Sequence, residues 1–229
     1  MKPLRNGKRY HSFKPDDPNS KNAIPRADKG QESSHHYWVW AALLAIILLT
    51  VAIRVRLLEV PLERDEGGYA YTAQLILQGI PPFAQVSAPH MPGLHYVYAV
   101  ILLIFGQTTV GIHLGLLVMN AATVLLMFLL GRRLFDSTTG IVAGASYAIM
   151  SLSQGVQGFS ANAEHLLILP ALGGIFLMLR AIGSGRLRSF FGSGLLLGFA
   201  LIIKQQGIFF VGFAGVYLFL SYFKKPRNR

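Results

Sequence analysis

The polar run ERDE at residues 63–66 stands directly after the first long apolar segment of the chain. Only two further carboxylates follow it, Asp136 and Glu164. Carboxylates can accept a proton from a reacting group or bind a divalent cation through oxygen. The adjacent acids Asp65 and Glu66, at the boundary of an apolar segment, are therefore the first candidates for chemistry.

The composition indicates an integral membrane protein. Of 229 residues, 52% are hydrophobic and 14% are charged, whereas about 25% of a soluble domain is charged. The net charge is +11, but the basic residues lie at the ends of apolar stretches, where they act as topology determinants, so no nucleic-acid partner is expected. The absence of cysteine excludes disulfides and thiol catalysis.

The apolar stretches predict an all-α fold, a polytopic membrane helical bundle. A helix rises about 1.5 Å per residue and needs about 20 mostly apolar residues to cross a bilayer. About six transmembrane helices are expected, over residues 37–58, 108–130, 140–157, 164–181, 189–204 and 207–223.

The apolar stretch at 94–105 has 12 residues and is too short to cross. When it is excluded, 17 of the 21 basic residues fall on one side, which the positive-inside rule makes cytoplasmic. Both termini are then cytoplasmic, and the first extracytoplasmic loop carries two interfacial helices, 66–78 and 94–105. Asp65 and Glu66 are expected to face water and lipid headgroups at the start of the first one.

Three regions follow from this layout. Residues 1–36 are polar and basic and predict a disordered cytoplasmic tail, since they cannot bury a core. Residues 37–223 form the transmembrane module, whose first span serves as an uncleaved anchor. Residues 224–229 are a basic cytoplasmic end.

The order and spacing of several motifs resemble the GT-C superfamily of membrane glycosyltransferases, which use polyprenyl-phosphate sugars. The likeness is to the protein O-mannosyltransferase, aminoarabinose transferase and RgtA/B/C/D-like branch, and it covers residues 38–223. The matching motifs are RDEGGYAY at 64–71 with Ala73 and Gly79, PHMPGLHY at 89–96, LLGRRLF at 129–135, NAE at 162–164, and GFALIIK at 198–204 with Gly207. Met91 stands where the family usually has proline, and no lysine precedes the turn, which leaves His90 for a phosphate contact there.

The resemblance implies a glycosyltransferase, mannosyltransferase-like, of the cell envelope. Asp65 would be the catalytic base that takes a proton from the acceptor, with Glu66 as its helper. The alternative interpretation is that Asp65 caps the following helix while Glu66 favours the positive helix end. Arg64 is a substrate-binding candidate, although pairing with Glu63 also explains it.

Further substrate-binding candidates are Tyr69, His90, Glu164 and Lys204. Glu164 is an acid at the outer mouth of a span, a place where acids are often functional; a helix-start carboxylate aided by Asn162 is the alternative. Lys204 would neutralise the phosphate of the departing lipid, although snorkelling to the headgroups also explains it. No cofactor and no metal are expected; a divalent cation on the acids is the less favoured option.

The expected partners are a polyprenyl-phosphate sugar, an extracytoplasmic acceptor (glycan, lipid or protein) and membrane lipid, in a bacterial inner membrane. Members of this family have about twice the six spans predicted here. A truncated or split form, in which a second polypeptide supplies further helices, is therefore a hypothesis that stays open. The alternatives to an enzyme are a non-catalytic lipid- or partner-binding subunit and a cation-coupled transporter.

Overall fold

The computed structural model describes residues 29–85 and 90–224, with side chains from Tyr37 to Phe223. From Tyr37 onward the described residues form one compact unit. The described residues contain helices and no strand, so the predicted all-α membrane bundle is confirmed. The helices are α1 (Lys29–Val55), α2 (Arg64–Leu77), α3 (Pro92–Phe105), α4 (Thr109–Leu134), α5 (Ser137–Met150), α6 (Ala163–Ser184), α7 (Leu187–Ile203) and α8 (Gly207–Lys224).

Three of the described helices are long and apolar enough to cross a membrane: α1 from Tyr37, α4 and α6. The other three predicted spans correspond to α5, α7 and α8, which have 14, 17 and 18 residues. The predicted span 140–157 was too long, because α5 ends at Met150 and a short 3-10 helix follows at Gln154–Val156. Serine and glycine at 151–155 explain this end, since both are poor helix formers.

The two helices expected in the first loop are present. α2 ends at Leu77, and Gly79 adopts a φ of +83°, the left-handed conformation in which glycine ends a helix. α3 begins at Pro92, because proline at the first helical position needs no hydrogen-bond acceptor for its nitrogen. α3 is apolar but, at 14 residues, is shorter than the candidate spans.

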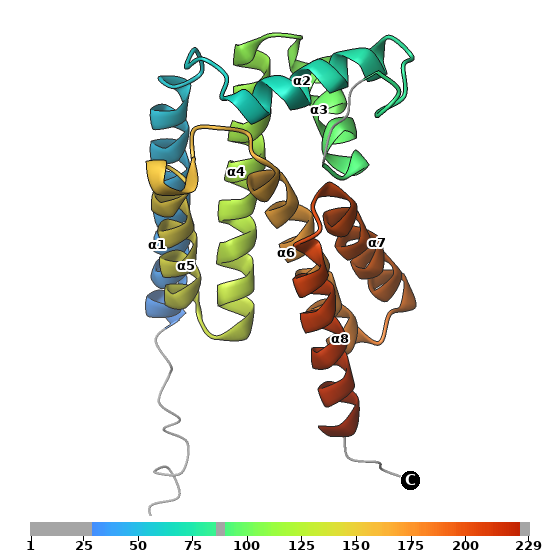
Figure 1. The fold of residues 1–229 in the computed structure, drawn as a ribbon. Helices are drawn as coiled ribbons and strands as arrows, with labels where there is room; N and C mark the ends of the chain where they lie inside the picture. Colours follow the sequence, from blue (N-terminus) through green and yellow to red (C-terminus); the bar gives the residue numbers. More distant parts are fainter. Residues whose placement is uncertain (1–28, 86–89, 225–229) are drawn as a thin grey trace, which may run out of the picture. The chain divides into compact units, whose positions relative to one another are not determined.

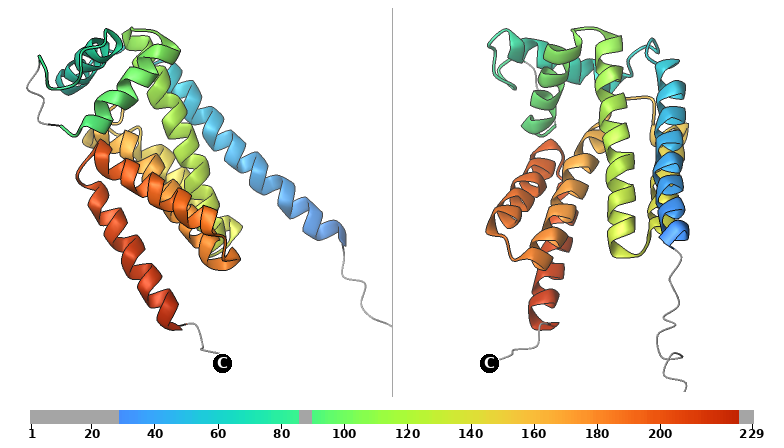
Figure 2. Two further views of the ribbon diagram at one scale, coloured as in Figure 1. Left: turned by 90° about the vertical axis from the view of Figure 1, so that its right-hand side faces the viewer. Right: turned by 180° about the vertical axis from the view of Figure 1, so that it is seen from behind.

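The main apolar core joins α2, α3, α4, α6 and α7. It includes Tyr69 and Ala73 of α2, Leu94 and Tyr98 of α3, and Leu166 of α6. A second cluster joins α6, α7 and α8, and a third packs Leu43 of α1 against Val124, Phe128 and Ala148 of α4 and α5. Figures 1 and 2 show α2 and α3 gathered at one end of the long helix α4.

Three connecting segments meet at this end of the unit. The guanidinium of Arg54, at the end of α1, is buried and donates to the carbonyl oxygens of Ser151 (2.6 Å) and Gly158 (3.0 Å) between α5 and α6. The turn between α7 and α8 reaches the start of α6 through an ion pair of Lys204 with Glu164. The loops that the sequence analysis assigned to one side of the membrane therefore do lie together.

Basic residues mark the opposite end of α4. Arg132 lies over the ring of Trp40 at 5.7 Å, and Arg133 donates to the carbonyl oxygen of Leu179 at 2.9 Å. Most of the predicted disordered tail lies outside the described residues, although α1 already begins at Lys29. The predicted basic end, 224–229, also lies outside them except for the last backbone position of α8.

Candidate active site

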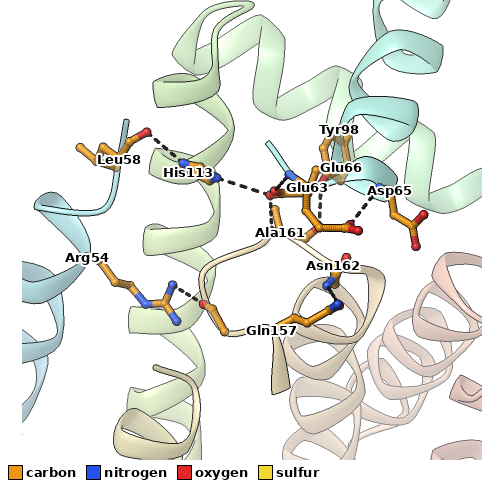
Figure 3. Close-up of polar contacts among 11 residues, drawn as sticks. Arg54, Leu58, Glu63, Asp65, Glu66, Tyr98, His113, Gln157, Ala161 and Asn162 are labelled. Atoms are coloured by element: carbon orange, nitrogen blue, oxygen red, sulfur yellow. Dashed lines mark hydrogen bonds and ion pairs between the residues drawn. The ribbon is translucent and has the colours of Figure 1, made fainter. Parts of the chain in front are cut away.

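Glu66 is buried, with 1% of its surface exposed. Its carboxylate accepts the backbone N–H groups of Glu63 (3.0 Å) and Ala161, and lies 3.5 Å from Nε2 of His113 (Figure 3). The expectation that Glu66 faces water was therefore wrong. The physical reason is helical spacing: positions 66, 69, 70 and 73 share one face of α2, and that face packs on the core.

Asp65 differs from its neighbour in having an exposed side chain. Its backbone N–H donates to Oε2 of Glu63 at 2.9 Å, so Glu63, and not Asp65, is the N-cap of α2. Together Glu63 and Glu66 form a capping box. Figure 3 shows the Asp65 carboxylate directed away from the Glu66–His113 contact, which leaves it accessible to a ligand.

Arg64 is exposed at the first position of α2. Two contacts in the described part of the chain have ion-pair geometry, Lys204–Glu164 and, when the imidazole is protonated, His113–Glu66, so the suggested pairing of Arg64 with Glu63 is not formed. Its cation is free to approach a ligand near Asp65.

The polar contacts of Glu66 lower its pKa by more than burial raises it. Burial by itself opposes ionisation, but the nearby imidazole of His113 and the N–H groups donated by Ala161 and Glu63 lower the pKa of the Glu66 carboxyl below its ordinary value. Glu66 is thus a carboxylate at neutral pH, with an assigned donor on each oxygen. Such an arrangement suits a fixed support and not a group that exchanges protons with a substrate.

Tyr69 and His90 come together beside these acids. The Tyr69 hydroxyl lies 3.2 Å from Nε2 of His90, and their rings meet edge to face at 4.9 Å. Burial, together with the negative charges of Asp65, Glu164 and Glu63, raises the pKa of Tyr69 to about 12. The Tyr69 phenol therefore stays protonated and keeps a hydrogen to donate.

Glu164 and Lys204 were predicted separately, and the structure pairs them. Nζ of Lys204 donates to Oε1 of Glu164, whose side chain is 61% exposed against 22% for Lys204. Asn162, the expected aid to Glu164 at the helix start, makes no capping hydrogen bond and donates to Gln157 instead. Glu164 is open to solvent and Lys204 is partly exposed, so a phosphate group can reach the lysine from the side of Glu164.

Sequence reasoning missed His113, Tyr98 and Arg54. His113 is a histidine within an apolar span, which by itself is a signal of function or of a buried polar contact. The Tyr98 hydroxyl donates to the carbonyl oxygen of Ala161 at 2.6 Å, from a ring with no exposed surface. Its partner is a backbone atom 63 positions away, which no local pattern indicates.

An apolar groove of about 460 Å³ lies between α3, α4 and α7. Its lining includes Tyr96, Val100 and Ile104 of α3, Val118 of α4 and Phe199 of α7. Among the residues that the structure describes, no group of three or more histidine or acidic side chains has an arrangement that could hold a metal ion. Independence from metal nevertheless stays a prediction.

Comparison with known proteins gives one match. Residues 87–228, more than half of the chain, match the model of a protein family described as dolichyl-phosphate-mannose-protein mannosyltransferase. No curated protein and no solved structure matches the chain. The matched part contains His90, His113, Glu164 and Lys204, and it begins after α2, which carries Asp65 and Glu66.

Proposed function

Because the chain belongs to the dolichyl-phosphate-mannose-protein mannosyltransferase family, of the GT-C type, we propose that it moves a sugar from a polyprenyl-phosphate donor to an acceptor outside the cytoplasm. The membership confirms the resemblance drawn from the motifs and makes the chain an integral membrane protein of a glycosyltransferase family. The donor, the acceptor and the roles of individual residues are parts of the proposal.

The observation that carries the proposal is the contrast between two neighbouring acids. Glu66 is buried and its oxygens are occupied, whereas Asp65 is exposed beside it. A base must be ionised and within reach of the acceptor hydroxyl, and Asp65 meets the requirement of access. Glu66, which the sequence analysis also placed among the catalytic residues, takes a supporting part.

In the proposed reaction, the acceptor oxygen attacks the anomeric carbon of the sugar and gives its proton to the Asp65 carboxylate. The new carbon–oxygen bond forms as the bond from the anomeric carbon to the phosphate oxygen breaks. The electron pair of that bond leaves with the polyprenyl phosphate. Lys204 stabilises the negative charge that develops on the phosphate, which is where preorganised charge lowers a barrier.

Substrate binding is assigned to the groups around Asp65. Tyr69 has a hydroxyl hydrogen to donate, and His90 lies within reach of the same hydroxyl. Glu164 holds Lys204 before the donor binds, and Arg64 is exposed one position before Asp65. The apolar groove between α3, α4 and α7 offers a surface for the lipid chain, because its lining is almost wholly apolar.

We further propose that the end of the molecule bearing these residues lies outside the cytoplasm, with both termini inside, in a bacterial inner membrane. The basic residues support this orientation, since Arg132 and Arg133 lie at the opposite end of α4.

The direct test uses purified protein in liposomes with radiolabelled polyprenyl-phosphate mannose. Glycan, lipid and peptide acceptors are offered in turn, and free polyprenyl phosphate is measured with the labelled product. The proposal predicts transfer of label together with release of the lipid phosphate. Proton-coupled uptake of a solute without transfer would instead support the transporter alternative.

A further inference from the structure

His113 on α4 lies between two fixed acceptors. Its Nδ1 is 2.9 Å from the carbonyl oxygen of Leu58, and its Nε2 is 3.5 Å from Oε1 of Glu66. The ring is buried, with 5% of the residue exposed. Figure 3 shows the imidazole bridging the segment that follows α1 and the first turn of α2.

The partners determine where the ring carries hydrogens. A backbone carbonyl can only accept, so Nδ1 must carry a hydrogen. The Glu66 carboxylate already accepts two backbone N–H groups. A neutral ring would turn the bare lone pair of Nε2 toward this carboxylate, which is unfavourable in a buried site. An imidazolium, with a hydrogen on each nitrogen, keeps the hydrogen bond to Leu58 and turns the 3.5 Å contact with Glu66 into an ion pair that neutralises the buried negative charge.

The same carboxylate joins the two segments that carry the exposed acids. Its bond to the N–H of Glu63 fixes the first turn of α2, where Asp65 lies. Its bond to the N–H of Ala161 fixes the segment three positions before Glu164. Tyr98 of α3 holds the carbonyl oxygen of the same Ala161.

We propose that His113, as an imidazolium, is a positioning residue for sugar transfer: it holds Glu66, and through Glu66 it fixes Asp65 relative to Glu164 and Lys204. This role rests on the proposed function. His113 itself touches no substrate, because Glu66 lies between it and the exposed acid. A displacement of about 1 Å at a reacting group can cost on the order of a hundredfold in rate, so loss of the imidazolium is expected to lower kcat by tenfold or more.

The charge state is tested without any activity measurement. Protein labelled with ¹⁵N at histidine is studied by NMR, and the His113 signals are assigned by their loss in His113→Gln. We expect both ring nitrogens to be protonated in the unmodified protein and a neutral tautomer in Glu66→Gln. A neutral His113 ring in the unmodified protein, or a ring unaffected by Glu66→Gln, would overturn the inference.

The positioning role is tested by kinetics with a matched control. His113→Gln is expected to lower kcat about tenfold or more while leaving KM for the donor within about twofold. Glu66→Gln combined with His113→Gln is expected to be no slower than the slower single variant, since the two residues act as one unit.

Asn120→Leu is the control, because Asn120 is also a buried polar residue of α4 but bonds Leu116 and Tyr147. Equal losses of kcat in His113→Gln and Asn120→Leu, at equal losses of thermal stability, would show that His113 serves the fold alone and would overturn the positioning role. If the unmodified protein transfers no sugar, the proposed function and the positioning role both fail. The NMR experiment still shows whether His113 is an imidazolium paired with Glu66.

Discussion

The buried carboxylate of Glu66 accepts the backbone N–H of Ala161, 95 positions further along the chain. This one contact ties the first turn of α2 to the segment that leads into α6. Asp65 stands one position before Glu66, and Glu164 stands three positions after Ala161. The relative placement of the two exposed acids therefore depends on a residue that the solvent does not reach.

Glu66 is expected to make the stability of the fold depend on pH. Its folded-state pKa lies below the ordinary 4.5, so its contribution is full above about pH 4.5 and is lost as the pH falls through the lowered value. At pH 7, Glu66→Gln should cost about 1–3 kcal/mol, because a buried hydrogen-bonded carboxylate loses its charge. Thermal unfolding in detergent, followed from pH 7 down to pH 3, measures both effects.

The difference between the unmodified protein and Glu66→Gln should narrow as the pH falls below 4.5. Glu59→Gln provides the control, since Glu59 is exposed just before α2 and should change stability little. A constant difference across the whole pH range would contradict the assigned ionisation of Glu66.

Lys204 is expected to affect the donor and not the fold. Replacing it by glutamine removes the cation proposed to face the lipid phosphate, so KM for the donor should rise about tenfold or more, with kcat also lowered. Stability should change by about 1 kcal/mol or less, because its partner Glu164 is largely exposed. Steady-state kinetics with a polyprenyl-phosphate sugar measure the change, and Lys204→Arg, which keeps the charge, should restore most of the affinity. A KM equal to that of the unmodified protein in Lys204→Gln would remove Lys204 from the donor site.

Gly93 allows α3 to approach α7 closely. A Cβ added there would lie 2.5 Å from the carbonyl oxygen of Ile202, a backbone atom that cannot turn away. Gly93→Ala should therefore destabilise the protein by about 1–3 kcal/mol. Gly198→Ala is the matched control, since a Cβ there meets nothing within 4 Å and alanine favours a helix by about 0.5–1 kcal/mol. Melting temperatures in detergent should move in opposite directions; a shared direction would argue against the close contact of α3 with α7.

The membrane orientation can be tested by single cysteines, because the chain has none of its own. Glu59 lies at the end of the unit that we place outside, and Ser184 lies at the far end of α6; both side chains are exposed. A membrane-impermeant maleimide added to intact cells should label Glu59→Cys and should leave Ser184→Cys unlabelled until the cells are opened. Labelling of Ser184→Cys alone would reverse the proposed orientation.

Local signals in the sequence predicted the elements of the fold. The apolar stretches predicted the helices, Gly79 predicted the end of α2, and the charge distribution predicted loops that lie together at one end of the helices. The burial of Glu66 was also predictable, because it is spaced with Tyr69 and Ala73 along one face of α2, but its position next to Asp65 suggested exposure instead.

Contacts between distant segments were not predictable in this way. The pairing of Lys204 with Glu164 spans 40 positions, and that of His113 with Leu58 spans 55. Both depend on how the helices pack, which a single sequence does not encode in any local pattern. For the same reason, the sequence did not show that Asn162 fails to cap α6 with its side chain. That side chain donates to Gln157 in the preceding loop instead.

The central claim is that Asp65 is the base for sugar transfer. The most direct measurement is the single-turnover rate of transfer from labelled polyprenyl-phosphate mannose by Asp65→Asn, with Glu59→Gln as a control that removes a nearby exposed carboxylate. Asparagine keeps the size of the side chain but cannot take the acceptor proton, so the rate should fall by about 10²–10⁴ while membrane insertion and melting temperature stay unchanged. Transfer by Asp65→Asn at a rate within about twofold of that of Glu59→Gln would contradict the assignment.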